Sequence, residues 1–177
     1  FDKTAKLLGL NYPGGAEIER MAKEGIEDSF KLPKPLINEK NFNFSFSGIK
    51  THINILTKKN NIDKNFINNL SASFQKTVSQ IIISKILTGI AILNKKKINI
   101  ESISIVGGVA NNKYIKEKLE NLFAKKNIRL YYPLKEMMSD NAAMIAWACI
   151  RKYKNNIKNK NDIFFRPQAK MEINKIL

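Results

Sequence analysis

The sequence predicts an α/β protein with a largely helical first half. Residues 98–153 alternate strand and helix patterns, the order expected of a parallel-paired layer flanked by helices. Residues 1–97 are dominated by helical patterns and are predicted to be a covering or inserted segment. Residues 154–177 are predicted to be a solvated linker rich in lysine and asparagine, followed by a docked tail.

The first half is predicted to contain four helices, over residues 2–9, 16–24, 48–58 and 64–94. A turn rich in helix breakers, Gly9 to Gly15, separates the first two. Residues 42–46 alternate aromatic and polar side chains, which predicts a half-buried strand. Ser47 is predicted to cap the third helix.

The long fourth helix follows from apolar residues at a spacing of four, at Leu70, Phe74, Val78, Ile82, Ile86 and Ile90. Its opposite face is also fairly apolar, so we expect burial on more than one side. Gly89 is predicted to mark a bend or a break.

The second half is predicted to form strands at 98–106 and 128–132 and helices at 112–126 and 140–153. Between the first strand and the first of these helices lies the pair Gly107 and Gly108. Glycine has no Cβ, so a ligand can approach the backbone closely there, and amides at a helix start can bind an anion such as phosphate. The alternative is an ordinary tight turn.

Composition limits the classes of function. The net charge of +16 at pH 7 favours a polyanionic partner such as nucleic acid. The alternative is codon bias, because lysine, asparagine and isoleucine are all abundant. No apolar run reaches the roughly 18 residues that span a membrane, so no membrane partner is expected. The lone Cys149 excludes an internal disulfide and is predicted to be a buried, inert thiol.

Four motifs occur in order along the chain. They are Phe1-Asp-Lys-Thr-Ala-Lys-Leu-Leu-Gly-Leu10 with Tyr12-Pro-Gly-Gly15, Phe44-Ser-Phe-Ser-Gly-Ile-Lys-Thr51, Gly107-Gly-Val-Ala-Asn-Asn112 and Ser139-Asp-Asn-Ala-Ala-Met-Ile-Ala146. Together they closely resemble the C-terminal half of the TsaD family of tRNA adenosine threonylcarbamoyltransferases. Arg166-Pro167 is similar to the closing motif of that family.

The resemblance implies the actin-like, sugar-kinase-like ATPase fold, which is ribonuclease-H-like. It also implies transfer of a threonylcarbamoyl group from threonylcarbamoyl-adenylate to the exocyclic amine of the adenosine beside the tRNA anticodon. Implied partners are tRNA and, in bacteria, the accessory subunits TsaB and TsaE. The implied location is the cytoplasm or an organelle. Because the chain begins with Phe1 and not Met, we expect it to be a C-terminal fragment, inactive alone.

The resemblance also implies roles for single residues. Asp2, Gly15 and Asn112 match positions that bind the substrate, with Gly107 and Gly108 as the loop beside the adenylate. Asp140 matches an aspartate that binds one divalent metal ion, iron or zinc. From the residues alone, the preferred interpretation of Asp2 is a first-turn helix acid, and that of Asp140 is a helix N-cap or first-turn acid.

The family completes its metal site with a pair of histidines that this sequence lacks. The only histidine is His52, which is predicted to be structural. Three departures from the family pattern, at Asn111, Lys116 and Ser139, remove no implied ligand. Two alternatives remain: an inactive nucleotide-binding scaffold of the same fold, and another actin-like phosphotransferase, for which no sugar-specific motif is present.

Overall fold

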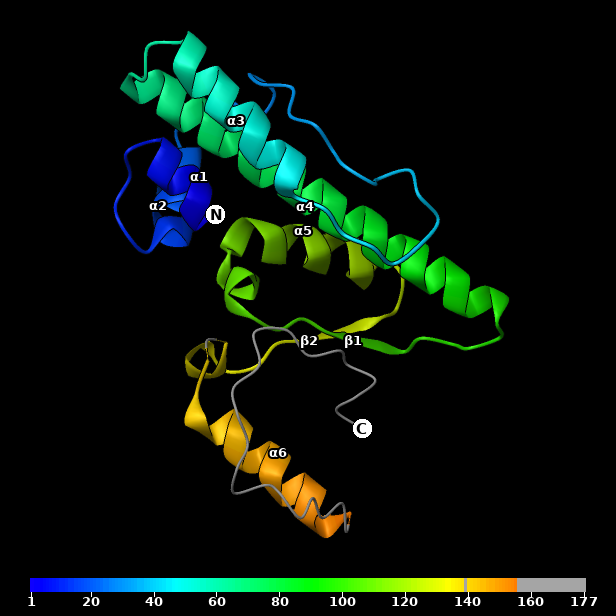
Figure 1. Cartoon of the computed structure of the whole chain (residues 1–177). Coiled ribbons are helices and arrows are strands. Elements are labelled where there is room, and N and C mark those ends of the chain that lie inside the picture. Colours follow the sequence, from blue (N-terminus) through cyan, green and yellow to red (C-terminus); the bar gives the residue numbers. More distant parts are fainter. Residues whose placement is uncertain (139, 156–177) are drawn as a thin grey trace. The chain divides into compact units, whose positions relative to one another are not determined.

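The computed structural model describes residues 1–138 and 140–155 and divides the chain into two compact units, Phe1–Ser139 and Asp140–Leu177 (Figure 1). The first unit contains all the described elements except one helix. In order, they are α1 (Asp2–Leu7), α2 (Gly14–Ala22), α3 (Ser47–Lys59), α4 (Lys64–Lys95), β1 (Ser102–Ser104), the 3₁₀ turn η1 (Gly108–Asn111), α5 (Lys113–Ala124), β2 (Arg129–Tyr131) and the 3₁₀ turn η2 (Lys135–Met137). The second unit contains α6 (Ala142–Lys154).

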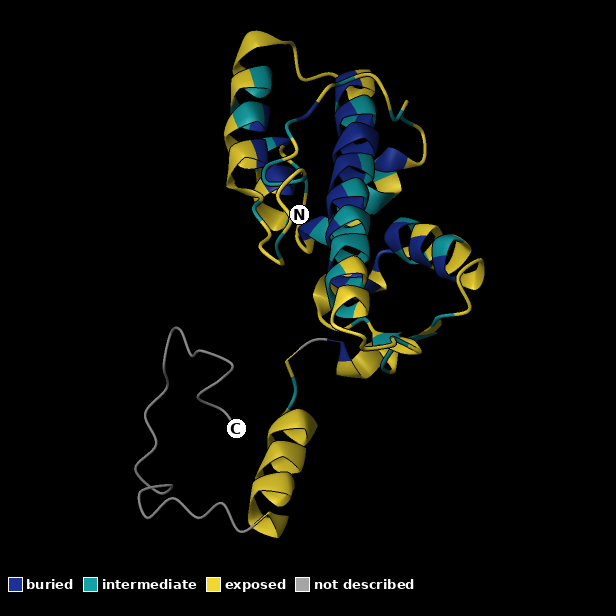
Figure 2. Ribbon diagram, turned by 90° about the vertical axis from the view of Figure 1, so that its right-hand side faces the viewer, coloured by how far each residue is buried: buried dark blue, intermediate teal, exposed yellow. Residues whose placement is uncertain are grey.

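Helix α4 forms the centre of the first unit, and Figure 2 shows it buried along much of its length. Its N-cap is Asp63, whose carboxylate accepts a hydrogen bond from the Phe66 amide at 2.7 Å. Helices α2 and α5 both pack on α4. Gly25, just after α2, lies against the Asn68 carbonyl so closely that a Cβ there would overlap it. Glycine therefore allows the close approach to α4.

The helix does not break at Gly89, because α4 continues through it. A Cβ at Gly89 would lie 3.2 Å from the Phe42 ring. The glycine therefore makes room for an aromatic neighbour from another segment. Tertiary packing decides its role, and a helix tolerates the modest cost of one interior glycine.

By length and composition α4 is long and apolar enough to cross a membrane, a property that the core helix of a globular protein can share. Several buried polar side chains of α4 hydrogen-bond to neighbouring segments: Asn68 to Glu24, Ser73 to the Ile26 carbonyl, and Gln75 to Asn112. These partners are those of a helix inside a protein core.

Strands β1 and β2 pair in parallel, as the strand–helix–strand order predicts, with α5 as the connection. The register places Ser102 opposite Arg129 and Ser104 opposite Tyr131. Both strands are shorter than their apolar patterns, since a strand ends where its partner ends. Among the described residues the sheet has only these two strands. The α/β character is thus confirmed, but a larger sheet is not seen within the described residues.

Two predictions about residues 42–47 are wrong. The aromatic run is irregular rather than a strand, and Phe44 and Phe46 remain 49% and 41% exposed. No described strand lies beside it to supply hydrogen bonds. Ser47 is already the first residue of α3, whose N-cap position is Phe46 without a side-chain cap.

Helix α6 was predicted correctly, but the prediction that Cys149 is buried is wrong. Every residue of α6 is exposed, including Cys149. An apolar helical face is buried only when another element packs against it. The predicted tail and its Arg166-Pro167 motif lie outside the described residues.

Candidate functional site

Asp2 and the turn before α2 are joined by a hydrogen bond. The Asp2 Oδ1 atom accepts the Gly14 amide at 3.0 Å, linking the first residue of α1 to the first residue of α2. A Cβ on Gly14 would lie 2.6 Å from the Ala5 Cβ and 2.7 Å from the Asp2 Cα. At Gly15 the nearest atom, the Phe1 Cβ, would be 3.9 Å away. The glycine that packing requires is therefore Gly14, which sequence reasoning did not single out.

Asn112 is the N-cap of α5 and is only 7% exposed. Its Oδ1 accepts the Ile115 amide at 2.9 Å, and its Nδ2 donates to Gln75 Oε1 at 2.8 Å. An asparagine amide has two N–H groups and two acceptor lone pairs. These two bonds leave one N–H group and one lone pair of the side chain for a further partner.

A carboxylate already lies at the start of α5. The Lys113 amide donates to Glu19 Oε1 at 2.7 Å, and this negative charge complements the positive end of the helix dipole. Glu19 and Asn112 thus accept hydrogen bonds from two of the amides at the start of this helix. Short-range sequence patterns contain no sign of Glu19, which comes from 94 residues earlier in the chain.

The double glycine forms an open backbone surface. Gly107 has a φ of +91°, a conformation that favours glycine, and it precedes the turn η1. A Cβ at Gly107 or at Gly108 would meet nothing within 4 Å. A ligand can therefore reach the backbone here without displacing protein atoms.

These contacts connect the predicted substrate positions within the first unit. Asp2 is bonded to the start of α2, and Glu19 of α2 is bonded to Lys113, next to Asn112. Asn112 is in turn bonded to Gln75 of α4. Gly15 lies in α2, and the double glycine lies in the loop before α5.

Asp140 belongs to the second unit and is described within that unit only. It is exposed and precedes the N-cap Asn141, whose Oδ1 accepts the Met144 amide at 2.9 Å. Asp140 is therefore neither the N-cap of α6 nor a residue of its first turn. No group of three His, Cys, Asp or Glu side chains comes together within residues 1–138 and 140–155. These residues do not by themselves fit a metal ion, since Asp140 would need ligands from elsewhere.

A polar cavity of about 320 Å³ lies where α2, α4 and α5 meet. Its lining includes Glu19, Gln75, Lys113 and Tyr114. Burial, with the nearby Glu27 carboxylate as the next cause, raises the pKa of the Tyr114 hydroxyl well above its usual range. The hydroxyl stays protonated at neutral pH, and the cavity presents one amide and one phenol beside two lysine ammonium groups and the carboxylates of Glu19, Glu27 and Glu117.

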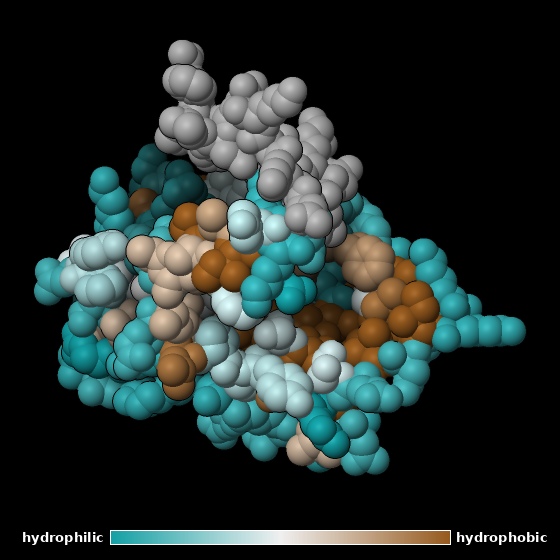
Figure 3. All heavy atoms as spheres, turned by 90° about the horizontal axis from the view of Figure 1, so that it is seen from below, coloured by the Kyte–Doolittle hydropathy of each residue, from teal (hydrophilic) through white to brown (hydrophobic). Residues whose placement is uncertain are grey.

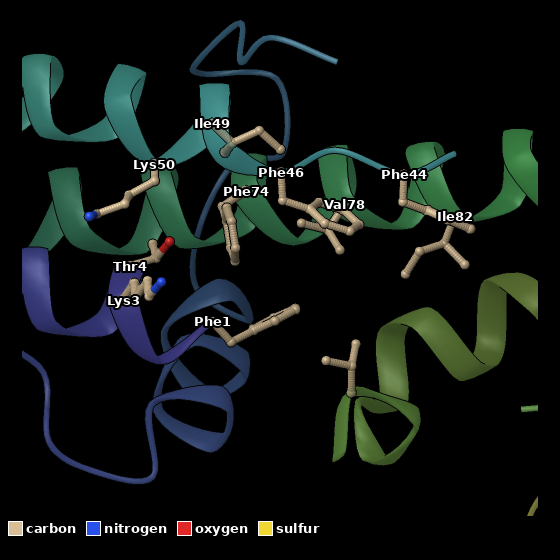
Figure 4. Close-up of a pocket in the computed structure, with 11 residues that line it drawn as sticks. Phe1, Lys3, Thr4, Phe44, Phe46, Ile49, Lys50, Phe74, Val78 and Ile82 are labelled. Carbon is tan, nitrogen blue, oxygen red and sulfur yellow. The ribbon is translucent and has the colours of Figure 1, made fainter. Parts of the chain in front are cut away.

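A second cavity, which we call the aromatic groove, has a volume of about 390 Å³. It lies between the segment that begins α1, the 42–46 run, α4 and the loop after β1 (Figure 4). Its apolar lining residues are Phe1, Phe44, Phe46, Ile49, Phe74, Val78, Ile82 and Val109. Lys3 and Lys50 also line it. Phe1 precedes Asp2, so the groove begins beside one of the predicted substrate residues.

Comparisons with known proteins find similarity over the part of the chain that contains these residues. The family model of TsaD, tRNA N6-adenosine threonylcarbamoyltransferase, matches residues 1–147. The chain is 39% identical over 171 residues to the tRNA N6-adenosine threonylcarbamoyltransferase of Thermosipho africanus, covering 97% of this chain and 50% of that protein. The protein of the same description from Rickettsia conorii is 41% identical, and the match covers 99% of this chain and 52% of that protein. The one from Wolbachia pipientis is 36% identical, and the match covers 97% of this chain and 50% of that protein. The chain spans about half the length of these relatives.

Proposed function

The chain belongs to the tRNA N6-adenosine threonylcarbamoyltransferase family, and we propose that the whole protein carries out this transfer. The substrates are threonylcarbamoyl-adenylate and a tRNA with an unmodified adenosine beside the anticodon. The exocyclic amine attacks the carbamoyl carbon, the bond from that carbon to the phosphate oxygen breaks, and AMP leaves as the amine loses a proton. AMP is a good leaving group because the adenylate is a mixed carbamic–phosphoric anhydride.

In this proposal the residues of the first unit hold the adenylate. Asp2 accepts hydrogen bonds from hydroxyl or amine groups, and Asn112 uses its remaining N–H group and lone pair. Gly107 and Gly108 let the adenylate approach the backbone. Gly15 contributes a surface without a side chain. Orientation of the carbonyl toward the incoming amine accounts for a large share of the acceleration.

Family membership also supports several wider proposals. The whole protein has the actin-like fold, and β1 and β2 are part of its larger sheet. One divalent ion, iron or zinc, is bound by Asp140 together with histidines that this chain does not contain. In bacteria the accessory subunits are TsaB and TsaE. The reaction takes place in the cytoplasm, or in an organelle if the protein is organellar.

One observation carries the proposal: the family match covers all the proposed site residues, from Asp2 to Asp140. The hydrogen bonds from Asp2 to Gly14 and from Glu19 to Lys113 support it, because they connect the elements that bear these residues. A chain that resembled the family only in amino-acid composition would not be expected to form these hydrogen bonds.

The test uses the whole protein with its accessory subunits, threonylcarbamoyl-adenylate and unmodified tRNA. Mass spectrometry of the digested tRNA measures the modified nucleoside. We expect product from the unaltered protein and at least a hundredfold less from Asp140→Ala. The matched control is Glu136→Ala, an exposed acid four residues earlier, which should retain activity.

The second candidate is an inactive nucleotide-binding scaffold of the same fold. Such a scaffold would be expected to lack the pocket residues, whereas Asp2, Gly15, Asn112 and Asp140 are all present. A folded whole protein that binds threonylcarbamoyl-adenylate but forms no modified nucleoside would support the scaffold and contradict the transferase.

A further inference from the structure

Gln75 is a polar side chain in the interior of the first unit. Figure 3 shows hydrophilic residues over much of the surface, with apolar residues gathered in patches. Gln75, in contrast, belongs to the buried part of α4 and is only 5% exposed. A buried amide is costly unless it is hydrogen-bonded, and an apolar side chain of similar size would fill the same space without that cost. The packing of α4 alone therefore does not require an amide at this position.

The hydrogen bond of Gln75 differs from those of its neighbours in the same helix. Three other buried polar side chains of α4 hydrogen-bond to residues 24–41: Asn68, Ser73 and Lys85. Gln75 is instead bonded, at 2.8 Å, to Asn112, the N-cap of α5 and a predicted substrate residue. Within the described part of the chain, no other side chain of α4 hydrogen-bonds to a predicted substrate residue.

The two hydrogen bonds of the Asn112 side chain agree on one orientation of its amide. Its Oδ1 atom accepts the Ile115 amide at 2.9 Å, and its Nδ2 atom donates to Gln75 Oε1 at 2.8 Å. Rotating this amide by 180° would exchange the two atoms, so that the nitrogen would face an N–H donor and the oxygen would face an acceptor. Both hydrogen bonds would then be lost. The α5 backbone and Gln75 thus hold the amide of Asn112 in place from two sides.

We propose that Gln75 is a positioning residue of the adenylate site, which acts by holding the side-chain amide of Asn112 in this orientation. The inference rests on the proposed function, in which Asn112 binds threonylcarbamoyl-adenylate. Asn112 then presents one N–H group and one lone pair in fixed directions. A group that is already held in its binding geometry loses less freedom when the ligand arrives. Removal of the Gln75 acceptor therefore weakens the affinity for the adenylate through Asn112.

The test measures the affinity of the whole protein for a non-hydrolysable analogue of threonylcarbamoyl-adenylate, by isothermal titration calorimetry without tRNA. Gln75→Met keeps the length of the side chain but removes the acceptor oxygen, and we expect it to raise the dissociation constant about tenfold. Gln75→Glu keeps an acceptor oxygen for Asn112 Nδ2, and we expect a change of less than about threefold. The matched control is Gln80→Met, at a half-buried glutamine of the same helix, which should bind as the unaltered protein does.

A double-mutant cycle separates positioning from a general effect on the fold. Asn112→Ala removes the side chain through which Gln75 acts. In that background we expect Gln75→Met to cause no further loss of affinity, whereas the effects of independent sites add. A general loss of stability would weaken binding in both backgrounds. Circular dichroism and thermal unfolding of each variant establish that the compared proteins are folded.

Three results would overturn the inference. One is unchanged affinity in Gln75→Met when Asn112→Ala binds weakly, and the proposed function would then stand without the inference. Another is an equal loss from Gln75→Met with and without the Asn112 side chain, which would give Gln75 a structural role only. The third is full affinity in Asn112→Ala, which would remove Asn112 from the adenylate site and would contradict that part of the proposed function as well.

Discussion

At the scale of single residues, buried polar side chains organise the candidate site. Gln75 is 5% exposed and Asn112 is 7% exposed, and each is the other's partner. Glu19 adds a bond across 94 residues of sequence to the amide next to Asn112. Buried polar groups are costly unless paired, so these residues also fix how α2, α4 and α5 pack together.

Replacing Gln75 with alanine should leave the Asn112 Nδ2 group without its buried acceptor. We expect the free energy of unfolding to fall by about 1–3 kcal/mol, the cost of an unsatisfied buried donor. Urea denaturation followed by circular dichroism measures it. The matched control is Gln80→Ala, a half-buried glutamine of the same helix, with an expected change within about 0.5 kcal/mol. Equal losses in the two variants would contradict the role given to Gln75.

Replacing the adjacent glycines Gly14 and Gly15 with alanine should change the stability of the protein by different amounts. Gly14→Ala forces a Cβ to within 2.6 Å of Ala5 and should cost about 1–3 kcal/mol through overpacking. Gly15→Ala meets only one atom, at 3.9 Å, and should change stability by less than about 0.5 kcal/mol. Thermal unfolding of the two variants side by side measures the difference. If Gly15→Ala also weakens adenylate binding in the whole protein, its cause is the ligand rather than the fold.

At the scale of elements, helix α4 joins the first unit together through different kinds of contact. Gly25 allows close approach of the segment after α2, and Lys64 of α4 forms an ion pair with Glu24 at 3.1 Å. Lys85 is 2% exposed and donates from its Nζ atom to the Glu39 carbonyl at 2.9 Å. The long stretch between α2 and α3 is thereby held along α4 without secondary structure of its own.

The Glu24 contacts predict a pH dependence. The hydrogen bond from Lys64 holds the pKa of the Glu24 carboxyl below its ordinary value of 4.5. The pKa of Glu24 is lower in the folded chain than in the unfolded chain. The stabilisation from Glu24 is therefore complete at pH values above its unfolded-state pKa, and it is lost as the pH falls through its folded-state pKa. Urea unfolding at pH 6, 4.5 and 3 should show that the free energy of unfolding falls less with decreasing pH for Glu24→Gln than for the unaltered chain. Glu101→Gln, an exposed acid before β1, should behave as the unaltered chain does.

At the scale of the whole molecule, net charge is the main feature. The chain has a net charge of +16 at pH 7 and spans about half the length of its relatives. The charge favours a polyanionic partner such as nucleic acid. Net charge bears on what the chain contacts rather than on how it folds.

Electrostatic binding to RNA should depend steeply on salt. We expect this chain to bind unmodified tRNA at 50 mM salt and to lose about tenfold or more of its affinity by 200 mM, because each neutralised phosphate releases a counterion. Filter binding at a series of salt concentrations gives the slope. Absence of binding at low salt would instead support codon bias as the origin of the charge.

The sequence by itself determined the helices, the parallel order of the two strands and the family. Periodic apolar patterns, glycine turns and four ordered motifs are local signals that do not depend on neighbours in space. Gly107 illustrates this, because its φ of +91° is a backbone property that a glycine between strand and helix already suggests.

Only the tertiary structure decided which partners those elements have. Asn112 reaches Gln75, Glu19 accepts the first amide of α5, and Gly89 accommodates Phe42, all across long separations in the chain. The predicted strand at 42–46 and the predicted burial of Cys149 failed for the same reason. A strand needs a second strand beside it, and a buried thiol needs an element that covers it. The local sequence pattern does not show whether either neighbour is present.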